Sequence, residues 1–332
     1  MTSTAIIITT FEWPEALELV FASAALQTVM PEEIHIADDG SGSETATVID
    51  RWRQRLPFPV FHHWHRNLGF RPNPVRNEAI ANCRSDLVIT IDGDMIMHPE
   101  FVADHQAFSR PGYFIQSRRV RLDKVLTENL LQRHRYRIGL FERGVRRRWM
   151  AIRSRLLAHL TTTQDQSMRR IRGANMSFWR KDLLAVNGLN EDFRGWGFED
   201  HELTARLFHA GLKRTYLRHA GLAYHLDHAD NSRDRKSLNQ AIFQQTLLDG
   251  TVCCRNGLAE NHRVDAGGES LSRFCGRDRV GSGGVSDDVV VAENRNLHDG
   301  EAFAHLDDRA DADEIAVRRF AHEIDVQAGG DR

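Results

Sequence analysis

The stretch LVITIDGD, residues 87–94, ends an apolar run with two carboxylates on either side of a glycine. An apolar run of this length predicts a strand that is buried on both faces. Carboxylates at the carboxyl end of such a strand lie where open α/β sheets bind ligands, and they repel each other unless a cation neutralises them. Oxygen ligands suit Mg²⁺ or Mn²⁺, ions that phosphates also bind. The alternative is that Asp92, Gly93 and Asp94 only form a turn.

Strands and helices alternate in the sequence before this stretch. Apolar runs at residues 5–10, 33–37 and 60–64 predict strands, and amphipathic helical patterns follow the first two of them. Short connections between alternating strands and helices favour right-handed crossovers and a mostly parallel, doubly wound sheet. The sequence therefore predicts an α/β fold with its ligand site at the carboxyl edge of that sheet.

Composition excludes several classes of protein. The 332 residues contain 41% hydrophobic residues, enough for a substantial core, and 44 basic against 46 acidic residues leave a net charge of −2. This balance argues against nucleic acid as a partner. The start of the chain has no basic region, and its apolar run is too short for a signal peptide or a membrane span. Four cysteines without metal-ligand spacing favour a reducing compartment, so we expect a cytoplasmic protein.

The pattern changes twice along the chain. Residues 124–160 interleave arginines with apolar residues, which is typical of a basic amphipathic helix or helix pair. This insertion either packs its apolar face on the sheet or rests at the periphery of an anionic membrane. Beyond residue 255 the sequence is rich in charged residues, Gly and Ala and predicts little packed core. We expect one domain over residues 1–255 and a tail over residues 256–332.

Polar motifs follow one another in a fixed order along the predicted domain. They are Thr9-Thr10, DDGS at 38–41, NLG at 67–69, Arg76-Asn77, DGD at 92–94, GAN at 173–175, WGFED at 196–200, and His225. The ordered set resembles the family 2 glycosyltransferases with the GT-A fold. The WGFED motif and Tyr224-His225 also resemble the carboxyl-terminal region of β-1,4-galactosyltransferases and chondroitin-polymerising transferases. The resemblance covers residues 4–250 and implies a single nucleotide-diphospho-sugar transferase domain.

The resemblance assigns the donor side of the site. It implies that Thr9 and Asp39 contact the uracil and ribose of a UDP-sugar, that Asp38 supports them, and that Arg76 binds the diphosphate. Carboxylates can accept hydrogen bonds from a base and from ribose hydroxyls, and guanidinium groups suit phosphate oxygens. The alternative for Asp38 and Asp39 is an acidic turn that caps the next helix.

The resemblance also implies a metal site. Asp92 is assigned to the ribose and the metal shell, Asp94 to direct coordination, and His225 to the third ligand position, although His228 is close enough in sequence to be the ligand instead. An imidazole nitrogen favours Mn²⁺ over Mg²⁺. The metal would stabilise charge on the leaving nucleoside diphosphate.

Catalysis is assigned to the WGFED motif. Asp200 would be the general base for the acceptor hydroxyl, Glu199 would bind sugar or acceptor hydroxyls, and Trp196 would form an apolar wall for a sugar ring. One base without a covalent nucleophile implies inversion, although a related group of retaining transferases carries a similar signature. The alternative is that the two carboxylates only stabilise a helix N-terminus.

The acceptor is expected to be a glycan or a lipid-linked molecule. Two other functions remain open at the level of sequence. A nucleotidyltransferase that makes nucleotide sugars would use a similar sheet, but it usually opens with a glycine-rich phosphate loop that is missing here. A non-catalytic module that binds a nucleotide sugar would not need both acidic pairs.

Overall fold

A computed structural model describes residues 2–229 and 234–258. Its main sheet has eight strands in the order β3-β2-β1-β4-β9-β6-β10-β8. The strands are β1 (Thr4–Thr10), β2 (Glu33–Asp38), β3 (Val60–Trp64), β4 (Leu87–Asp92), β6 (Tyr113–Ser117), β8 (Thr163–Asp165), β9 (Asn175–Trp179) and β10 (Lys213–Leu217). A second sheet has the order β5-β11-β7, with β5 (Met95–Met97), β7 (Arg119–Arg121) and β11 (Ala223–His225). The predicted tail lies outside the described residues from 259 onward.

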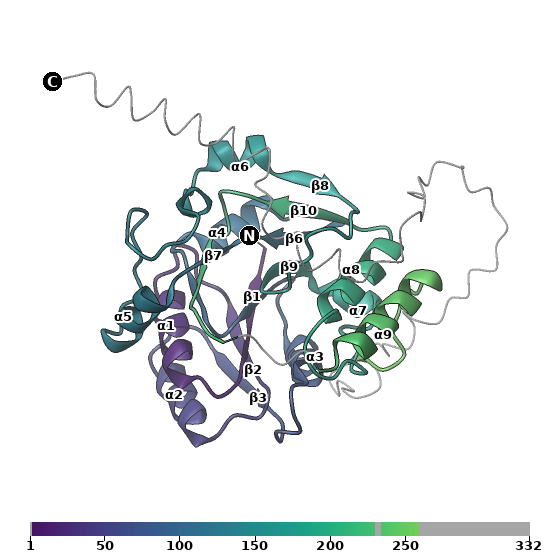
Figure 1. Ribbon diagram of the computed structural model, residues 1–332, viewed down its shortest axis with the longest axis horizontal. Coiled ribbons are helices and arrows are strands. Elements are labelled where there is room, and N and C mark those ends of the chain that lie inside the picture. The colour runs from purple at the N-terminus through teal and green to yellow at the C-terminus, as the bar shows by residue number, and fades with distance from the viewer. Residues whose placement is uncertain (1, 230–233, 259–332) are drawn as a thin grey trace. The chain divides into compact units, whose positions relative to one another are not determined.

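Helices cover both faces of the main sheet. They are α1 (Pro14–Ala24), α2 (Ser43–Arg53), α3 (Pro72–Asn82), α4 (Phe101–Phe108), α5 (Lys124–Gln132), α6 (Arg155–Thr161), α7 (Arg180–Ala185), α8 (Glu199–His209) and α9 (Lys236–Leu248), with a 3₁₀ turn η1 (Arg148–Ala151). Ile6 and Ile8 of β1 pack in a core with α1 and α2, whereas Ala5 and Ile7 pack with α3 and α8. Figure 1 shows α1 and α2 on one side of β2 and β3, and α3 on the other. Burial on both faces explains why Ala5–Ile8 of β1 form a continuous apolar run.

The predicted doubly wound, mostly parallel sheet is confirmed. Strands β1 to β4 are parallel, and β6 and β10 are parallel to each other. One strand that the sequence pattern did not indicate, β9, runs antiparallel between β4 and β6. Because β9 is antiparallel to both of its neighbours, β4 and β6 run in the same direction. The carboxyl ends of β1, β2, β4, β6 and β10 therefore meet at one edge.

The small sheet brings distant residues to this edge. Strand β11 pairs with β5, which follows Asp94 directly, and with β7 on its other side. The backbone N–H of Leu226 donates to the carbonyl of Asp94 at 3.0 Å. The pairing places the segment 225–228 beside the DGD motif.

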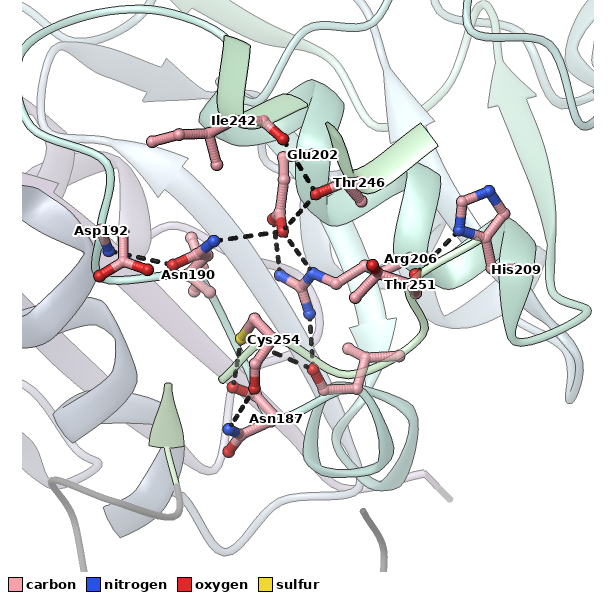
Figure 2. A network of polar contacts seen from close by, with 12 residues as sticks. Asn187, Asn190, Asp192, Glu202, Arg206, His209, Ile242, Thr246, Thr251 and Cys254 are labelled. Atoms are coloured by element: carbon pink, nitrogen blue, oxygen red, sulfur yellow. Dashed lines mark hydrogen bonds and ion pairs between the residues drawn. The ribbon is translucent and has the colours of Figure 1, made fainter. Parts of the chain in front are cut away.

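A buried ion pair anchors α8. The guanidinium group of Arg206 contacts both carboxylate oxygens of Glu202 at 2.8 Å, and it also donates to the carbonyl of Gly188 at 2.9 Å. Both side chains are almost completely buried. Figure 2 shows this pair at the centre of a polar network with Asn190 and with Thr246 of α9. The network joins α8 to α9 and to the loop that leads into the WGFED motif.

The arginine-rich segment at residues 124–160 contains α5, η1 and α6, with non-helical chain between them. Its apolar residues, among them Leu126, Leu130 and Ala151, pack in one core cluster with the small sheet. Within the described residues, no helix is both long and apolar enough to cross a membrane. Cys83 and Cys254 are buried free thiols, but Cys253 is disulfide-bonded, so the expectation of reduced cysteines does not hold for it.

Candidate functional site

The carboxylate of Asp94, just beyond the end of β4, lies beside two imidazoles. His228 Nε2 is 3.1 Å and His225 Nε2 is 3.5 Å from the same oxygen of Asp94, Oδ2. The two imidazole Nε2 atoms are 3.3 Å apart. The sequence left open which histidine faces Asp94, and the structure places both there.

The protonation of these groups follows from their surroundings. Burial, together with the charge of Asp94, raises the pKa of Asp92 to about 6. The pKa of Asp94 is lowered despite its burial, because His228 donates to it and His225 lies nearby. The contact with Asp94 raises the pKa of His228 to about 9, whereas burial lowers that of His225 to about 4. In this structure a protonated His228 therefore balances the charge of Asp94, and Asp92 adds a second buried carboxyl group beside that pair.

The residues fit a divalent metal ion. Asp94 Oδ1 is buried and has no hydrogen-bond partner among the described residues. Ligand atoms of Asp94, His225 and His228 all lie within 4.8 Å of one another. A second group with metal-binding residue types, Glu33, His35 and Cys83, lies at the start of β2. There, one oxygen of Glu33 already accepts hydrogen bonds from Arg84 N, Ser85 N and Ser85 Oγ, which makes that group structural.

Arg76 of α3 points to the ends of β1 and β4. Its Nε donates to Thr9 Oγ1 at 2.8 Å, and its Nη2 is 3.7 Å from Asp92 Oδ1. Thr9 and Asp92 are direct neighbours in the register of the two strands. The chain passes close to β1 at Gly93, whose N–H donates to the Thr9 carbonyl at 2.7 Å. Glycine is needed at this close approach, because a Cβ would lie 2.9 Å from the same oxygen. The structure thus unites three of the predicted donor-side residues.

Asp38 and Asp39, at the end of β2, are both buried, and the carboxylate of each accepts hydrogen bonds. Asp38 Oδ1 accepts from the N–H groups of Gly40 and Ser41, and its Oδ2 is 3.0 Å from His62 Nε2. Asp38 thereby holds the turn, as a supporting residue would.

Asp39 is held in a different way. It accepts from His65 Nε2 at 2.7 Å and from Arg71 N at 2.9 Å, and burial raises its pKa. His62 and His65 were not predicted, and nothing in their spacing distinguishes them from other histidines of the chain.

The acidic pair of the WGFED motif starts α8. Glu199 accepts from Gly197 N at 2.9 Å, and burial together with the charge of Asp200 raises its pKa to about 7. The carboxylate of Asp200 packs directly on Gly173, where an added Cβ would lie 2.0 Å from Asp200 Oδ1. The charge of Asp200 also contributes to the raised pKa of Asp92. Glycine at position 173 therefore makes room for Asp200 beside the carboxylates of β4.

Trp196 lies in a loop just before this pair and is 36% exposed. Gly195 and Gly197 on either side have φ angles of +74° and +111°, which favour glycine. Gly195 N donates to the carbonyl of Phe70 at 2.8 Å, and Asn239 of α9 donates to the carbonyl of Gly195. The loop is thus tied to α9 and to the segment that follows the NLG motif.

Arg119 is a site residue that the sequence did not indicate. It starts β7, in the strand beside β11, and its charge affects Asp92, Asp94 and His225. Burial and the nearby Arg121 and Arg172 lower its pKa, whereas Asp92 raises it. No motif contains Arg119, because its place depends on pairing between strands that are far apart in sequence.

Comparison with known proteins agrees with this geometry. Residues 4–172, about half of the chain, match glycosyl transferase family 2, and residues 158–229 match the N-terminal domain of galactosyltransferase. Chondroitin synthase of Pasteurella multocida (strain Pm70) is 25% identical over 269 residues, which are 73% of this chain and 27% of the relative. Validoxylamine A glucosyltransferase of Streptomyces hygroscopicus subsp. limoneus is 25% identical over 234 residues, or 64% and 49% of the two chains. The chain thus spans between about a quarter and a half of these relatives.

Solved structures show the same fold. S. aureus TarS 1–349 superposes with a TM-score of 0.51 at 14% identity, over 78% of this chain and 68% of TarS 1–349. The crystal structure of TarS 1–349 in complex with UDP gives a TM-score of 0.50 at 16% identity over the same shares. These likenesses support the GT-A fold and not a particular substrate. Because the family match extends from β1 past the DGD motif to the residue before Gly173, the chain belongs to glycosyl transferase family 2.

Proposed function

We propose that this domain transfers a sugar from a UDP-sugar to a hydroxyl group of a glycan or lipid-linked acceptor. The observation that carries the proposal is the convergence at one sheet edge of an acidic pair with two imidazoles and of a separate carboxylate, Asp200, held on a glycine. The acidic pair and the imidazoles can hold the cation that binds the leaving diphosphate. Asp200 can accept the proton of the attacking hydroxyl. The complex of TarS 1–349 with UDP supports the choice of a uridine nucleotide, and the names of the relatives support sugar transfer.

The donor lies along the ends of β1, β2 and β4. Thr9 and Asp39 face the uridine, and Asp38 keeps their turn in place. Arg76 is oriented by its bond to Thr9 and positions its charge for the diphosphate. Asp92 lies between Arg76 and Asp94, where it reaches both the ribose and the metal shell.

Asp94, Asp92 and His225, with His228 as a further ligand or in place of His225, would hold Mn²⁺ or Mg²⁺. When bound, the ion supplies Lewis acid stabilisation of the charge on the departing diphosphate. Imidazole ligands favour Mn²⁺.

Asp200 takes the proton from the acceptor hydroxyl as that oxygen attacks the anomeric carbon. It lies in the first turn of α8, where the helix N-terminus carries partial positive charge. Glu199 has a raised pKa and is suited to donate a hydrogen bond to a sugar or acceptor oxygen. A single base on this side gives inversion, and Trp196 provides apolar surface for a sugar ring.

A peripheral membrane location would bring a lipid-linked acceptor to the site. Leu156 and Leu160, one turn apart on α6, are 70% and 72% exposed, and Arg155 is next to them. Exposed leucines beside arginines favour contact with anionic lipid. We expect binding to anionic vesicles at low salt that weakens in Leu156→Ser/Leu160→Ser, and a wild type that ignores such vesicles would exclude this location.

The first test is release of the nucleoside diphosphate from UDP-sugars and other nucleotide sugars, with Mn²⁺ and with a chelator. Asp94→Asn and Asp200→Asn should each lower turnover by about a hundredfold or more, since each removes a group that acts in the transition state. Asp94→Asn should also weaken metal-dependent binding of UDP, whereas Asp200→Asn should not. Asp50→Asn is the matched control, because Asp50 is an exposed partner of Arg53 on α2.

The outcomes separate the candidate functions. Turnover that is lost in both site variants and kept in Asp50→Asn supports a glycosyltransferase and identifies the donor. Binding of UDP without any turnover would favour a binding module, and formation of a nucleotide sugar from a sugar phosphate would favour a nucleotidyltransferase. A wild type that does not bind UDP would rule out the proposed donor.

A further inference from the structure

Arginine and aromatic side chains gather at the carboxyl ends of β6 and β10, outside the roles assigned above. We call Arg118, Trp149, Tyr216 and Arg218 the arginine–aromatic wall. The guanidinium carbon of Arg118 is 5.0 Å from the centre of the Trp149 ring and 5.3 Å from that of Tyr216. Arg118 Nε also donates to Tyr216 Oη at 3.2 Å. The guanidinium carbon of Arg218 is 5.4 Å from the Tyr216 ring.

Among the residues that the structure describes, Arg118 contacts aromatic rings and forms no ion pair. Arg214 also contacts the Tyr216 ring, but it forms an ion pair with Asp165 at 2.9 Å. By contrast, over residues 2–229 and 234–258 no carboxylate lies within ion-pair distance of Arg118. Stacking on two rings orients its planar guanidinium group and limits its hydration, which suits binding of a carboxylate or phosphate by paired hydrogen bonds.

The backbone of Arg118 is linked to the strand that follows Gly173. The side-chain amide of Asn175 lies 3.4 Å from the carbonyl oxygen of Arg118 and donates to it. Asn175 is two residues after Gly173, on which the Asp200 carboxylate packs. The next residue, Arg119, acts electrostatically on Asp92 and Asp94. The chain that carries Arg118 is thus joined to the segment on which Asp200 packs and to the carboxylates that follow β4.

The wall lies away from the nucleotide side. Thr9, Asp39 and Arg76 belong to β1, β2 and the helix α3, whereas β6 and β10 lie beyond β4 and β9 in the sheet order. Figure 1 shows β6 and β10 on the opposite side of β9 from β2 and β3. A donor along β1, β2 and β4 leaves the ends of β6 and β10 to the acceptor.

We propose that the arginine–aromatic wall selects acceptors that carry an anionic group, a carboxylate or a phosphate, close to the sugar that is extended. Arg118 binds the anionic group, and the rings of Trp149 and Tyr216 add apolar surface for a neighbouring sugar ring. This inference rests on the proposed function, because only a sugar transferase has an acceptor. It adds the chemical class of that acceptor. Carboxylate and phosphate both offer the paired anionic oxygens that a guanidinium group binds, and separate probes for each are used below.

Binding without turnover tests the wall directly. The probes are an oligosaccharide with hexuronate residues, the same oligosaccharide with its carboxylates reduced to alcohols, and a glycerol phosphate oligomer, each titrated into the protein with UDP and Mn²⁺. The wild type should bind at least one anionic probe about tenfold or more tightly than the reduced oligosaccharide. Arg118→Gln should remove that preference, and Arg118→Lys should restore only part of it, because lysine keeps the charge but not the planar fork.

Arg110→Gln is the matched control. Arg110 lies at the opposite end of β6, is exposed, and stacks on Tyr113 at 3.8 Å. The Arg110→Gln variant should bind each probe with the same affinity as the wild type. Thermal melting of each variant shows whether the fold is kept.

Turnover with the same molecules as acceptors gives a second readout. Arg118→Gln should raise the KM for the anionic acceptor more than it changes kcat. Equal binding of anionic and reduced probes by the wild type would overturn the proposal, as would a weaker affinity for UDP in Arg118→Gln, which would place Arg118 on the donor side. Charge-dependent probe binding in a protein that turns over no donor would support the wall while contradicting the proposed function.

Discussion

At the scale of single residues, the site depends on close packing around its carboxylates. Motif order alone indicated Asp92, Asp94 and Asp200, because short polar motifs at strand and helix ends carry a chemical signature. It could not decide between His225 and His228, which are three residues apart and both contact Asp94. Nor could it indicate Arg119, whose position is set by the pairing of β7 with β11.

Gly173 should be essential for turnover without being essential for folding. Alanine at this position would place its Cβ 2.0 Å from Asp200 Oδ1 and force the carboxylate away. Displacement of a base by about 1 Å costs on the order of a hundredfold in rate, so we expect kcat of Gly173→Ala to fall by about that factor. UDP affinity should stay unchanged.

Gly139→Ala serves as the control for this substitution. A Cβ at Gly139 meets no atom within 4 Å, and its backbone does not require glycine. Steady-state kinetics and UDP titration measure both variants. Equal kcat for Gly173→Ala and the wild type would show that Asp200 does not act from its present position.

At the scale of helices and strands, α8 is held by a charge pair rather than by apolar packing alone. Glu202 and Arg206 are one turn apart and point toward each other (Figure 2). Arg206 also donates to the carbonyl groups of Val186 and Gly188. The helix begins at Glu199, where the sequence allowed for a helix N-terminus, and it ends at His209. That Glu202 and Arg206 face the interior could not be foreseen, because charged residues at this spacing are usually on a solvated surface.

Breaking the buried pair should be costly. Arg206→Met leaves the Glu202 carboxylate buried without its partner, and we expect a loss of about 3–5 kcal/mol in the free energy of unfolding. Lys124→Met is the matched control, since Lys124 and Glu128 form an exposed pair at the same spacing, and it should change stability by less than about 0.5 kcal/mol.

Urea denaturation of both variants gives the comparison. Glu202→Leu/Arg206→Met should recover much of the loss, because it removes both charges. If Arg206→Met were as stable as Lys124→Met, the network in Figure 2 would not anchor α8.

At the scale of the whole molecule, the amino-terminal half was more predictable than the rest. Strands β1, β2 and β4 are buried along nearly their whole length, and their parallel direction followed from the alternation of strands with helices. Strands β5, β7 and β11 have three residues each, too few for a periodic pattern. The antiparallel course of β9 is set by pairing with strands far away in the sequence, which local patterns do not contain.

Stability should fall as the solution becomes mildly acidic, in part because of His105. This buried side chain of α4 bonds to Ser177 and Asn175 of β9, and burial lowers its pKa from 6.5 to about 4, although the nearby Asp104 acts in the opposite direction. As pH falls from 6.5 to 4, the unfolded chain takes up the proton first. The folded state therefore loses up to about 3 kcal/mol relative to the unfolded state over this range.

His105→Gln should show a shallower loss of stability between pH 6.5 and 4, because glutamine does not titrate. Denaturation midpoints at pH 7.5, 6 and 4.5 would measure the difference between the two proteins. Parallel curves would mean that His105 titrates equally in the folded and unfolded chains.

The central position of β4 also has a consequence for how the chain folds. Ile8 pairs with Ile36, 28 residues later, but β4 pairs on one side with β1, as Ile91 with Ile8, and on the other with β9, as Ile91 with Asn175. Both of those partners are more than eighty residues away. Contacts at such separation require large loops to close and form slowly. We expect the first βαβ units to assemble early, and the acidic pair that ends β4 to reach its partners only in the last steps of folding.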